Sequence, residues 1–175
     1  MTKRIIVTGA TGLIGRKLVD TLISRGDEVT IFSRDAEKAK LIFPKAKECV
    51  EWNYRKPELW KSKLENRDAV VHLSGANLFS KRWNESFKRE ILESREVSTK
   101  NLVEAIGKSQ SKPLVLISAS GVGYYGDCGD NILMEESAAG IDFLADVCKL
   151  WESEARKVEQ FGIRSVQIRT GLVLS

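Results

Sequence analysis

Three glycines near the start of the chain have the spacing of a phosphate-binding loop. Gly9, Gly12 and Gly15 lie between an apolar run and an amphipathic stretch in the pattern G-x-x-G-x-x-G. Gly9 would permit a tight turn, Gly12 would let the backbone approach a pyrophosphate, and Gly15 would let a helix pack closely on a strand. The amide groups and the positive dipole end of that helix would then face the anion. Because no G-K-[S/T] follows, the pattern is not the phosphate loop of nucleotide hydrolases.

The residues that end the second apolar run bear on which dinucleotide would bind. Ser33 and Arg34 stand there. A guanidinium can form two hydrogen bonds with a phosphate, so Arg34 favours NADP, which carries an extra phosphate on its adenosine ribose. Asp35 would instead favour NAD, but we interpret it as the cap of a short helix because Ala-Glu-Lys follows it. NADP is therefore the predicted cofactor, NAD is the alternative, and another nucleotide with a ribose phosphate stays open.

Short β-branched runs alternate with longer amphipathic stretches along the chain. This alternation predicts βαβ units in a parallel sheet, and thus a single α/β domain over residues 1–175. The predicted strands are Arg4 to Thr8, Glu28 to Ser33, Glu48 to Glu51, Ala69 to Ser74, Leu114 to Ser118 and Arg164 to Arg169. The predicted helices are Leu13 to Arg25, stopped by Gly26, Asn84 to Gly107, and one that Asp142 caps and that ends at Phe161 before Gly162.

A long segment from Ala119 to Gly140 follows the fifth predicted strand and is rich in Gly and Asp. Its position after a strand end predicts a loop over the carboxyl edge of the sheet, where open α/β folds bind their ligands. Loops of this length usually have a function.

The composition excludes several classes of protein. With 42% hydrophobic and 30% charged residues, the chain is expected to fold. Its net charge of +4 is spread along the sequence, and basic residues alternate with Glu over positions 81–100, so nucleic acid is not an expected partner. One histidine and three separated cysteines cannot form a zinc site or a disulfide framework. Since neither a membrane-length apolar run nor a signal peptide is present, we expect a soluble cytoplasmic protein without a membrane partner.

Several segments taken together closely resemble the atypical short-chain dehydrogenase/reductases known as nucleoside-diphosphate-sugar epimerase-like proteins. The resemblance covers essentially the whole chain and implies a doubly wound Rossmann sheet in the order 3-2-1-4-5-6 that binds NADP. The segments are TGATGLIG, SRD, DAVVHLSGANLFSKRW, KREILESR, SASGVGYYGD, DFLADVCKLWESEA and RTGLVLS.

The resemblance also implies which residues touch the cofactor. The pyrophosphate would lie at the glycine loop, the extra phosphate at the end of the second strand, and the remainder after the fourth strand, on the long helix and near the end of the chain. The implied residues are Gly9, Thr11, Gly12, Leu13, Ile14, Gly15, Ser33, Arg34, Leu73, Ser74, Gly75, Glu90, Arg95 and Val173.

The wider superfamily carries a Tyr-x-x-x-Lys pair on the helix after the fifth strand, in which the lysine lowers the tyrosine pKa for proton transfer. Leu144 and Cys148 occupy these positions here, and neither can do that chemistry. The remaining candidates for catalysis are Ser118 or Ser120, which could polarise a substrate oxygen, and Tyr125 or its neighbour Tyr124, which could supply a phenol.

Two functions remain open. The first is an NADP-dependent oxidoreductase or epimerase that acts on a nucleotide-sugar-like or other small alcohol or carbonyl substrate. The second is a non-catalytic NADP(H) sensor or interaction module, which the absent Tyr-x-x-x-Lys pair favours. In the family, the segment RTGLVLS leads to a smaller substrate-binding domain, so we expect that domain to be missing from this chain. By the same resemblance, the long charged helix could pair two copies in a homodimer.

Overall fold

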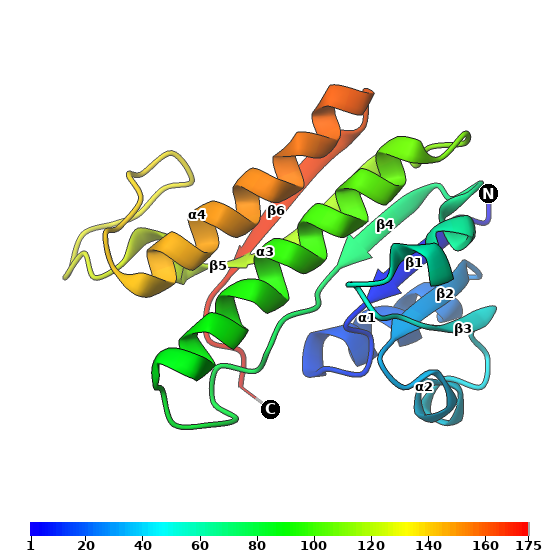
Figure 1. Cartoon of the computed structure of the whole chain (residues 1–175), viewed down its shortest axis with the longest axis horizontal. Coiled ribbons are helices and arrows are strands. Elements are labelled where there is room, and N and C mark those ends of the chain that lie inside the picture. The colour runs from blue at the N-terminus through cyan, green and yellow to red at the C-terminus, as the bar shows by residue number, and fades with distance from the viewer. Residues whose placement is uncertain (175) are drawn as a thin grey trace.

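The structure, a computed structural model, describes residues 1–174 and is built on a six-stranded parallel sheet. The strand order is β3-β2-β1-β4-β5-β6, so that β2 and β3 are added on one side of β1 and β4, β5 and β6 on the other (Figure 1). This order is the doubly wound one that was predicted. The strands are β1 (Arg4–Thr8), β2 (Glu28–Ser33), β3 (Glu48–Glu51), β4 (Ala69–His72), β5 (Val115–Gly121) and β6 (Arg164–Thr170).

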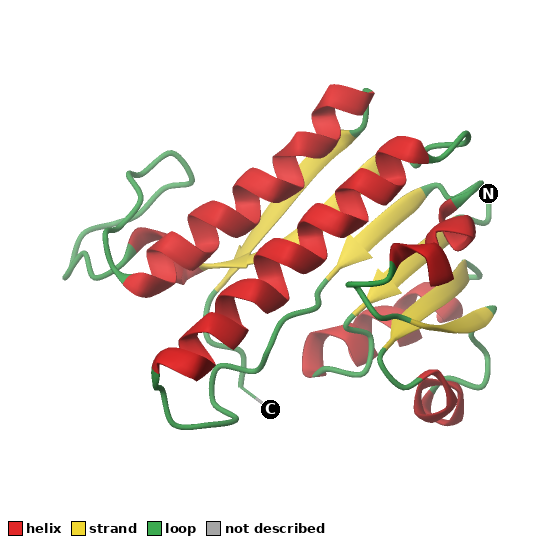
Figure 2. Ribbon diagram, in the orientation of Figure 1, coloured by secondary structure: helices red, strands yellow, loops and turns green. Residues whose placement is uncertain are grey.

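Helices cover both faces of the sheet, and α3 and α4 run side by side over one of them (Figure 2). The residues of β1 show the alternation that this requires: Ile6 packs with the cluster of α3 and α4, whereas Ile5 and Val7 pack with that of α1 and α2. The helices are α1 (Leu13–Ser24), α2 (Ala36–Ile42), α3 (Glu85–Lys108) and α4 (Phe143–Arg156).

The residues that the sequence predicts to begin or end helices do so in the structure. The Asp35 carboxylate accepts a hydrogen bond from the Lys38 amide at 2.8 Å, and Asp142 accepts one from the Ala145 amide at 2.8 Å. Gly162 follows the last turn with φ of +76°. Left-handed backbone of this kind favours glycine and stops the helix.

The predicted loop from Ala119 to Gly140 is wrong over its first seven residues. β5 continues through Ser120 to Gly121, because these residues pair with β6, and a short 3-10 helix (Val122–Tyr125) follows. Two further bounds differ from prediction by two or more residues. β4 ends at His72, two residues early, and α4 gives way at Lys157 to a 3-10 helix that reaches Phe161. Such tightening of a last helical turn is common.

Candidate dinucleotide-binding site

The glycine loop joins β1 to α1 and is shaped by two very close backbone approaches. Gly9 has φ of +69°, and a Cβ atom there would lie 2.7 Å from the carbonyl carbon of Leu73. A Cβ atom on Gly15 would lie 2.3 Å from the Gly9 carbonyl oxygen. The Gly12 amide closes the turn by donating to that same oxygen at 3.1 Å. The loop therefore requires glycine at positions 9 and 15 for steric reasons alone.

Substituting the second and third glycines of this loop should affect folding differently. We expect Gly15→Ala to lower the free energy of unfolding by about 1–3 kcal/mol, because the new methyl group overlaps backbone atoms that cannot move aside. Gly12→Ala should cost less than Gly15→Ala, since its Cβ atom would lie 3.3 Å from the Gly9 oxygen at an ordinary φ of −75°. Urea unfolding of both variants measures the difference, and equal losses would contradict the packing described here.

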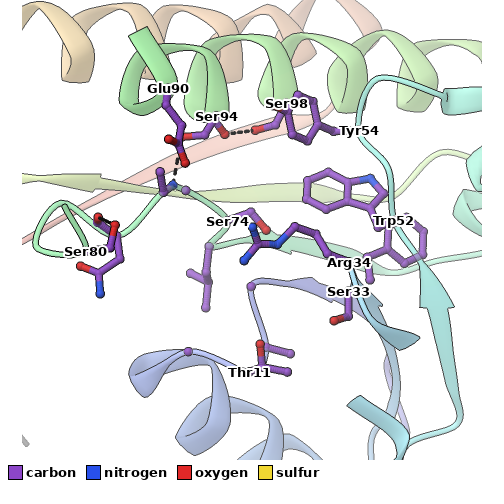
Figure 3. A pocket seen from close by; sticks show the side chains of 18 residues that line it. Thr11, Ser33, Arg34, Trp52, Tyr54, Ser74, Ser80, Glu90, Ser94 and Ser98 are labelled. Carbon is purple, nitrogen blue, oxygen red and sulfur yellow. Dashed lines mark hydrogen bonds between the residues drawn. The ribbon is translucent and has the colours of Figure 1, made fainter. Parts of the chain in front are cut away.

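A cavity of about 430 Å³ lies above the carboxyl ends of β1, β2, β3 and β4 (Figure 3). Nine of the predicted cofactor residues line it, and together they surround the switch point between β1 and β4, where doubly wound folds bind ligands. These nine are Gly9, Thr11, Gly12, Ser33, Arg34, Leu73, Ser74, Gly75 and Glu90.

Four other predicted cofactor residues line a second cavity of about 420 Å³ on the α1 side of the sheet. Apolar side chains of α1, β5 and β6 form its walls, including Leu18, Ile117 and Ile168. The four residues are Leu13, Ile14, Gly15 and Val173. Because Gly9, Gly12 and Leu73 belong to both cavities, the glycine loop forms the ridge between them.

Arg34 is the cation that the first cavity presents at the end of β2. Its side chain is exposed and extends into the cavity beside Ser33 (Figure 3). Within residues 1–174 it takes part in none of the ion pairs. The competing acid, Asp35, is committed to capping α2. The positive charge of Arg34 is thus available to an anion at this strand end.

An aromatic wall in the same cavity was not anticipated from the sequence. Trp52 and Tyr54 follow β3, and their ring centroids are 6.1 Å apart. Both lie on the Arg34 side of the cavity, because β3 is the neighbour of β2. The sequence could have indicated them, because the carboxyl ends of adjacent parallel strands meet at the same edge of the sheet, and both residues follow a predicted strand.

A buried histidine connects the two sides of the switch point. The His72 Nδ1 atom lies 2.8 Å from Oγ1 of Thr8, and its Nε2 atom lies 3.1 Å from Oγ1 of Thr99 on α3. The ring is fully buried and packs edge-on against Trp52. Burial lowers the pKa of His72 from 6.5 to about 3, so the imidazole is neutral at neutral pH. Through these two contacts His72 connects the end of β1, just before Gly9, to α3 above the cavity.

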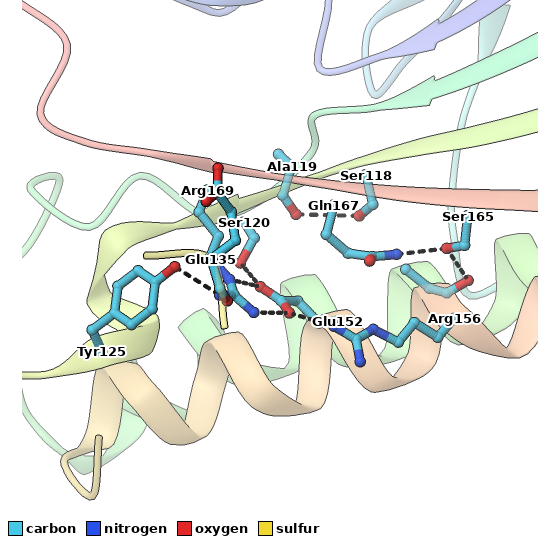
Figure 4. A network of polar contacts seen from close by, with 11 residues as sticks. Ser118, Ala119, Ser120, Tyr125, Glu135, Glu152, Arg156, Ser165, Gln167 and Arg169 are labelled. Carbon is cyan, nitrogen blue, oxygen red and sulfur yellow. Dashed lines mark hydrogen bonds and ion pairs between the residues drawn. The ribbon is translucent and has the colours of Figure 1, made fainter. Parts of the chain in front are cut away.

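The candidate catalytic serine Ser120 belongs to a buried polar cluster (Figure 4). Its hydroxyl donates to a carboxylate oxygen of Glu152 at 2.7 Å. Arg169 holds the same carboxylate through Nε at 2.7 Å and through one terminal nitrogen at 2.8 Å. Burial alone would raise the pKa of Glu152, but hydrogen bonds from Arg169 and Ser120 hold it below its usual value. Ser120 is thus engaged in a structural contact in this conformation.

Of the other three catalytic candidates, Ser118 and Tyr125 are also buried and engaged, and Tyr124 is half-buried with its ring centroid 3.5 Å from the Arg169 guanidinium carbon. The Ser118 hydroxyl donates to the Ala119 carbonyl at 3.2 Å, and the Tyr125 hydroxyl accepts a hydrogen bond from Arg169 at 2.8 Å. Neither they nor Ser120 are among the residues between positions 9 and 173 that line the two cavities. A catalytic role for these four residues stays a prediction.

The positions that would hold the tyrosine and lysine lie on the face of α4 that packs toward β5 and the 3-10 helix after it. Leu144 lies against Gly123, and the Cys148 sulfur lies 4.0 Å from the position of a Cβ atom on Gly121. Arg95, predicted to touch the cofactor, lines neither cavity but packs behind the wall residue Gly75.

Within residues 1–174, no helix has the length and apolar character needed to cross a membrane.

Comparison with known proteins places this geometry in a family. The chloroplastic epimerase family protein SDR39U1 homologue of Arabidopsis thaliana is 39% identical over 170 residues, which cover 96% of this chain and 48% of the relative. An epimerase family protein of Staphylococcus haemolyticus is 37% identical over 99% of this chain and 56% of its own length. The chain thus spans about half the length of these relatives.

Solved structures agree with these sequence relatives. The human epimerase family protein SDR39U1, crystallised with NADPH, is 32% identical with a TM-score of 0.80, over 98% of this chain and 55% of that one. A nucleoside-diphosphate sugar epimerase from Corynebacterium glutamicum is 36% identical with a TM-score of 0.79, over 100% of this chain and 35% of that one. The model of the NAD-dependent epimerase/dehydratase family matches residues 5–143. The chain belongs to the NAD-dependent epimerase/dehydratase family.

Proposed function

We propose that residues 1–175 form the NADP(H)-binding domain of an epimerase-family oxidoreductase. The observation that carries the proposal is the first cavity, where the glycine loop at β1 and the exposed guanidinium of Arg34 at β2 line one space. The human relative crystallised with NADPH supports the choice of the phosphorylated cofactor. The substrate we propose is a small alcohol or carbonyl compound, such as a sugar nucleotide.

The residues of the cavity fit the parts of the proposed cofactor. The amides at Gly12 and at the start of α1 would hold the diphosphate, because a helix N-terminus favours an anion and Gly12 leaves its backbone bare. Arg34 and Ser33 would hold the phosphate on the adenosine ribose. Trp52 and Tyr54 would contact the adenosine half, since they line the cavity next to the end of β2. A bound nicotinamide would supply or accept the hydride.

Reversing the charge at Arg34 tests the cofactor assignment. We expect Arg34→Glu to weaken NADPH binding by about 1–3 kcal/mol, because a charge-assisted contact with the ribose phosphate is lost. NADH binding, which has no such phosphate, should not weaken. Titration by cofactor fluorescence measures both, with Lys45→Glu as a charge-matched control at an exposed lysine that does not line the cavity. Unchanged NADPH affinity in Arg34→Glu would contradict the assignment.

A second function, an NADP(H) sensor without catalysis, is favoured by two specific observations. Leu144 and Cys148 stand where the proton-transfer pair is expected, and the Ser120 hydroxyl is bound to a buried carboxylate. The two functions differ in turnover. A panel of sugar nucleotides and simple carbonyls, assayed for NADPH oxidation with the protein at its full length, distinguishes them: oxidation with any member supports the oxidoreductase, and tight binding without oxidation supports the sensor.

A further inference from the structure

Arg95 on α3 is a half-buried cation whose hydrogen-bond partners are all uncharged. One terminal nitrogen donates to the Ile91 carbonyl at 3.1 Å and lies 3.4 Å from the Ser94 hydroxyl. The other donates to the Ala76 carbonyl at 3.1 Å. The guanidinium carbon lies 5.1 Å from the centre of the Trp151 ring, at the distance of a cation–π contact.

No carboxylate within residues 1–174 forms an ion pair with Arg95. Burial lowers its pKa, but arginine stays protonated in proteins at neutral pH. Two carboxylates of α3 and α4 pair with other cations, Glu90 with Lys81 and Glu152 with Arg169. Placing a charge out of water without a counter-charge is costly, so this positive charge is a feature that packing alone does not explain.

The position of Arg95 relative to the cavity indicates what the charge acts on. Its guanidinium carbon lies 3.0 Å from where a Cβ atom on Gly75 would stand, and Gly75 lines the cavity just after β4. On the proposed function, the adenosine end of the cofactor would lie at β2 and its diphosphate at β1. Because β4 and β5 follow β1 in the sheet, the nicotinamide half would extend over their carboxyl ends. Arg95 lies behind Gly75, which that half would face.

We propose that Arg95 makes the site select the reduced cofactor, NADPH, over NADP⁺. The oxidised nicotinamide ring carries a positive charge and the reduced ring carries none. An uncompensated guanidinium behind Gly75 therefore repels only the oxidised ring, and in a partly desolvated site this repulsion is weakly screened. The inference rests on the proposed NADP(H) binding and adds the redox form that the site prefers.

Calorimetric titration of the 175-residue chain with three ligands tests the proposal. The ligands are NADPH, NADP⁺ and 2′-phospho-ADP-ribose, which keeps the diphosphate and the phosphate on the adenosine ribose but lacks the nicotinamide ring. We expect the unsubstituted chain to bind NADPH about tenfold more tightly than NADP⁺, which is what one charge–charge repulsion over roughly 12 Å would give near a protein surface. Arg95→Met should bring the two affinities close together, whereas Arg95→Lys should keep most of the preference because it keeps the charge.

The remaining measurements separate a specific effect from a general one. Arg89→Met, at an exposed position of the same helix, should leave the preference unchanged. Arg95→Met should bind 2′-phospho-ADP-ribose as the unsubstituted chain does, which shows that the folded cavity persists. Equal affinities for NADPH and NADP⁺ in the unsubstituted chain, or a preference that survives Arg95→Met, would overturn the role of Arg95 alone. Failure of all three ligands to bind would instead overturn the proposed function.

Discussion

Replacing Glu152 with alanine should lower the free energy of unfolding by about 3–5 kcal/mol, the usual cost of removing one partner from a buried ion pair. The Glu152 side chain is only 3% exposed, and that of its main partner Arg169 is 14% exposed. Without the carboxylate, the Ser120 hydroxyl loses its acceptor, and the Arg169 guanidinium loses its counter-charge and keeps only uncharged acceptors. Urea unfolding at pH 7 measures the loss.

Two further variants show whether the loss comes from the ion pair. Glu159→Ala, at an exposed glutamate of the following 3-10 helix, should change stability by less than about 0.5 kcal/mol. Replacing Glu152 and Arg169 together by methionine should cost less than Glu152→Ala alone, because no uncompensated charge is left behind. A loss below about 1 kcal/mol for Glu152→Ala would place the pair among weak surface contacts and contradict its burial.

Acidification should destabilise the protein through His72 well before most carboxylates titrate. The folded-state pKa is depressed to about 3 from the usual 6.5, so between these values the unfolded chain binds a proton that the folded chain does not. Stability is therefore complete above pH 6.5 and falls as the pH drops below it, by about 1.4 kcal/mol per pH unit, or about 2 kcal/mol between pH 7.5 and pH 5. Urea midpoints across this interval measure the slope.

This slope can be assigned without ambiguity because His72 is the only histidine in the chain. His72→Gln removes the titrating group and should give a nearly flat profile between pH 7.5 and pH 5. The profile of this variant should bend only at lower pH, where Asp27 and Asp68, whose pKa values are held low by backbone amides, become protonated. A slope that persists in His72→Gln would show that another group, not the buried imidazole, carries the pH dependence.

The sheet and its switch point could be predicted from the sequence because each rests on a local signal. A β-branched run and the following glycine loop define β1 and α1 without reference to the remainder of the chain. Arg34 and the Asp35 cap are equally local, since both depend on where β2 ends. The predicted strand order came from the family resemblance, which supplies the long-range pairing that periodicity cannot.

Contacts between distant segments account for what the sequence could not predict. β5 extends to Gly121 only because β6 pairs with it, and nothing near Ser120 announces a strand. Its hydroxyl bonds to Glu152, which is 32 residues away, so a serine that looked available for catalysis proved to be engaged. Pairing of two copies through α3 depends on a contact outside one chain and stays a prediction.

The position of Arg169 has a consequence for how the molecules behave at high concentration. It lies near the carboxyl end of β6, the last strand of the sheet within the described residues, so its backbone borders a row of unpaired peptide groups. Strands of other molecules can pair with such an exposed edge. Natural proteins reduce this pairing in several ways, one of which is a charged side chain that points inward. A strand added beside Arg169 would have to share space with a guanidinium already fixed to Glu152. We therefore expect the ion pair that stabilises one molecule also to hinder its aggregation.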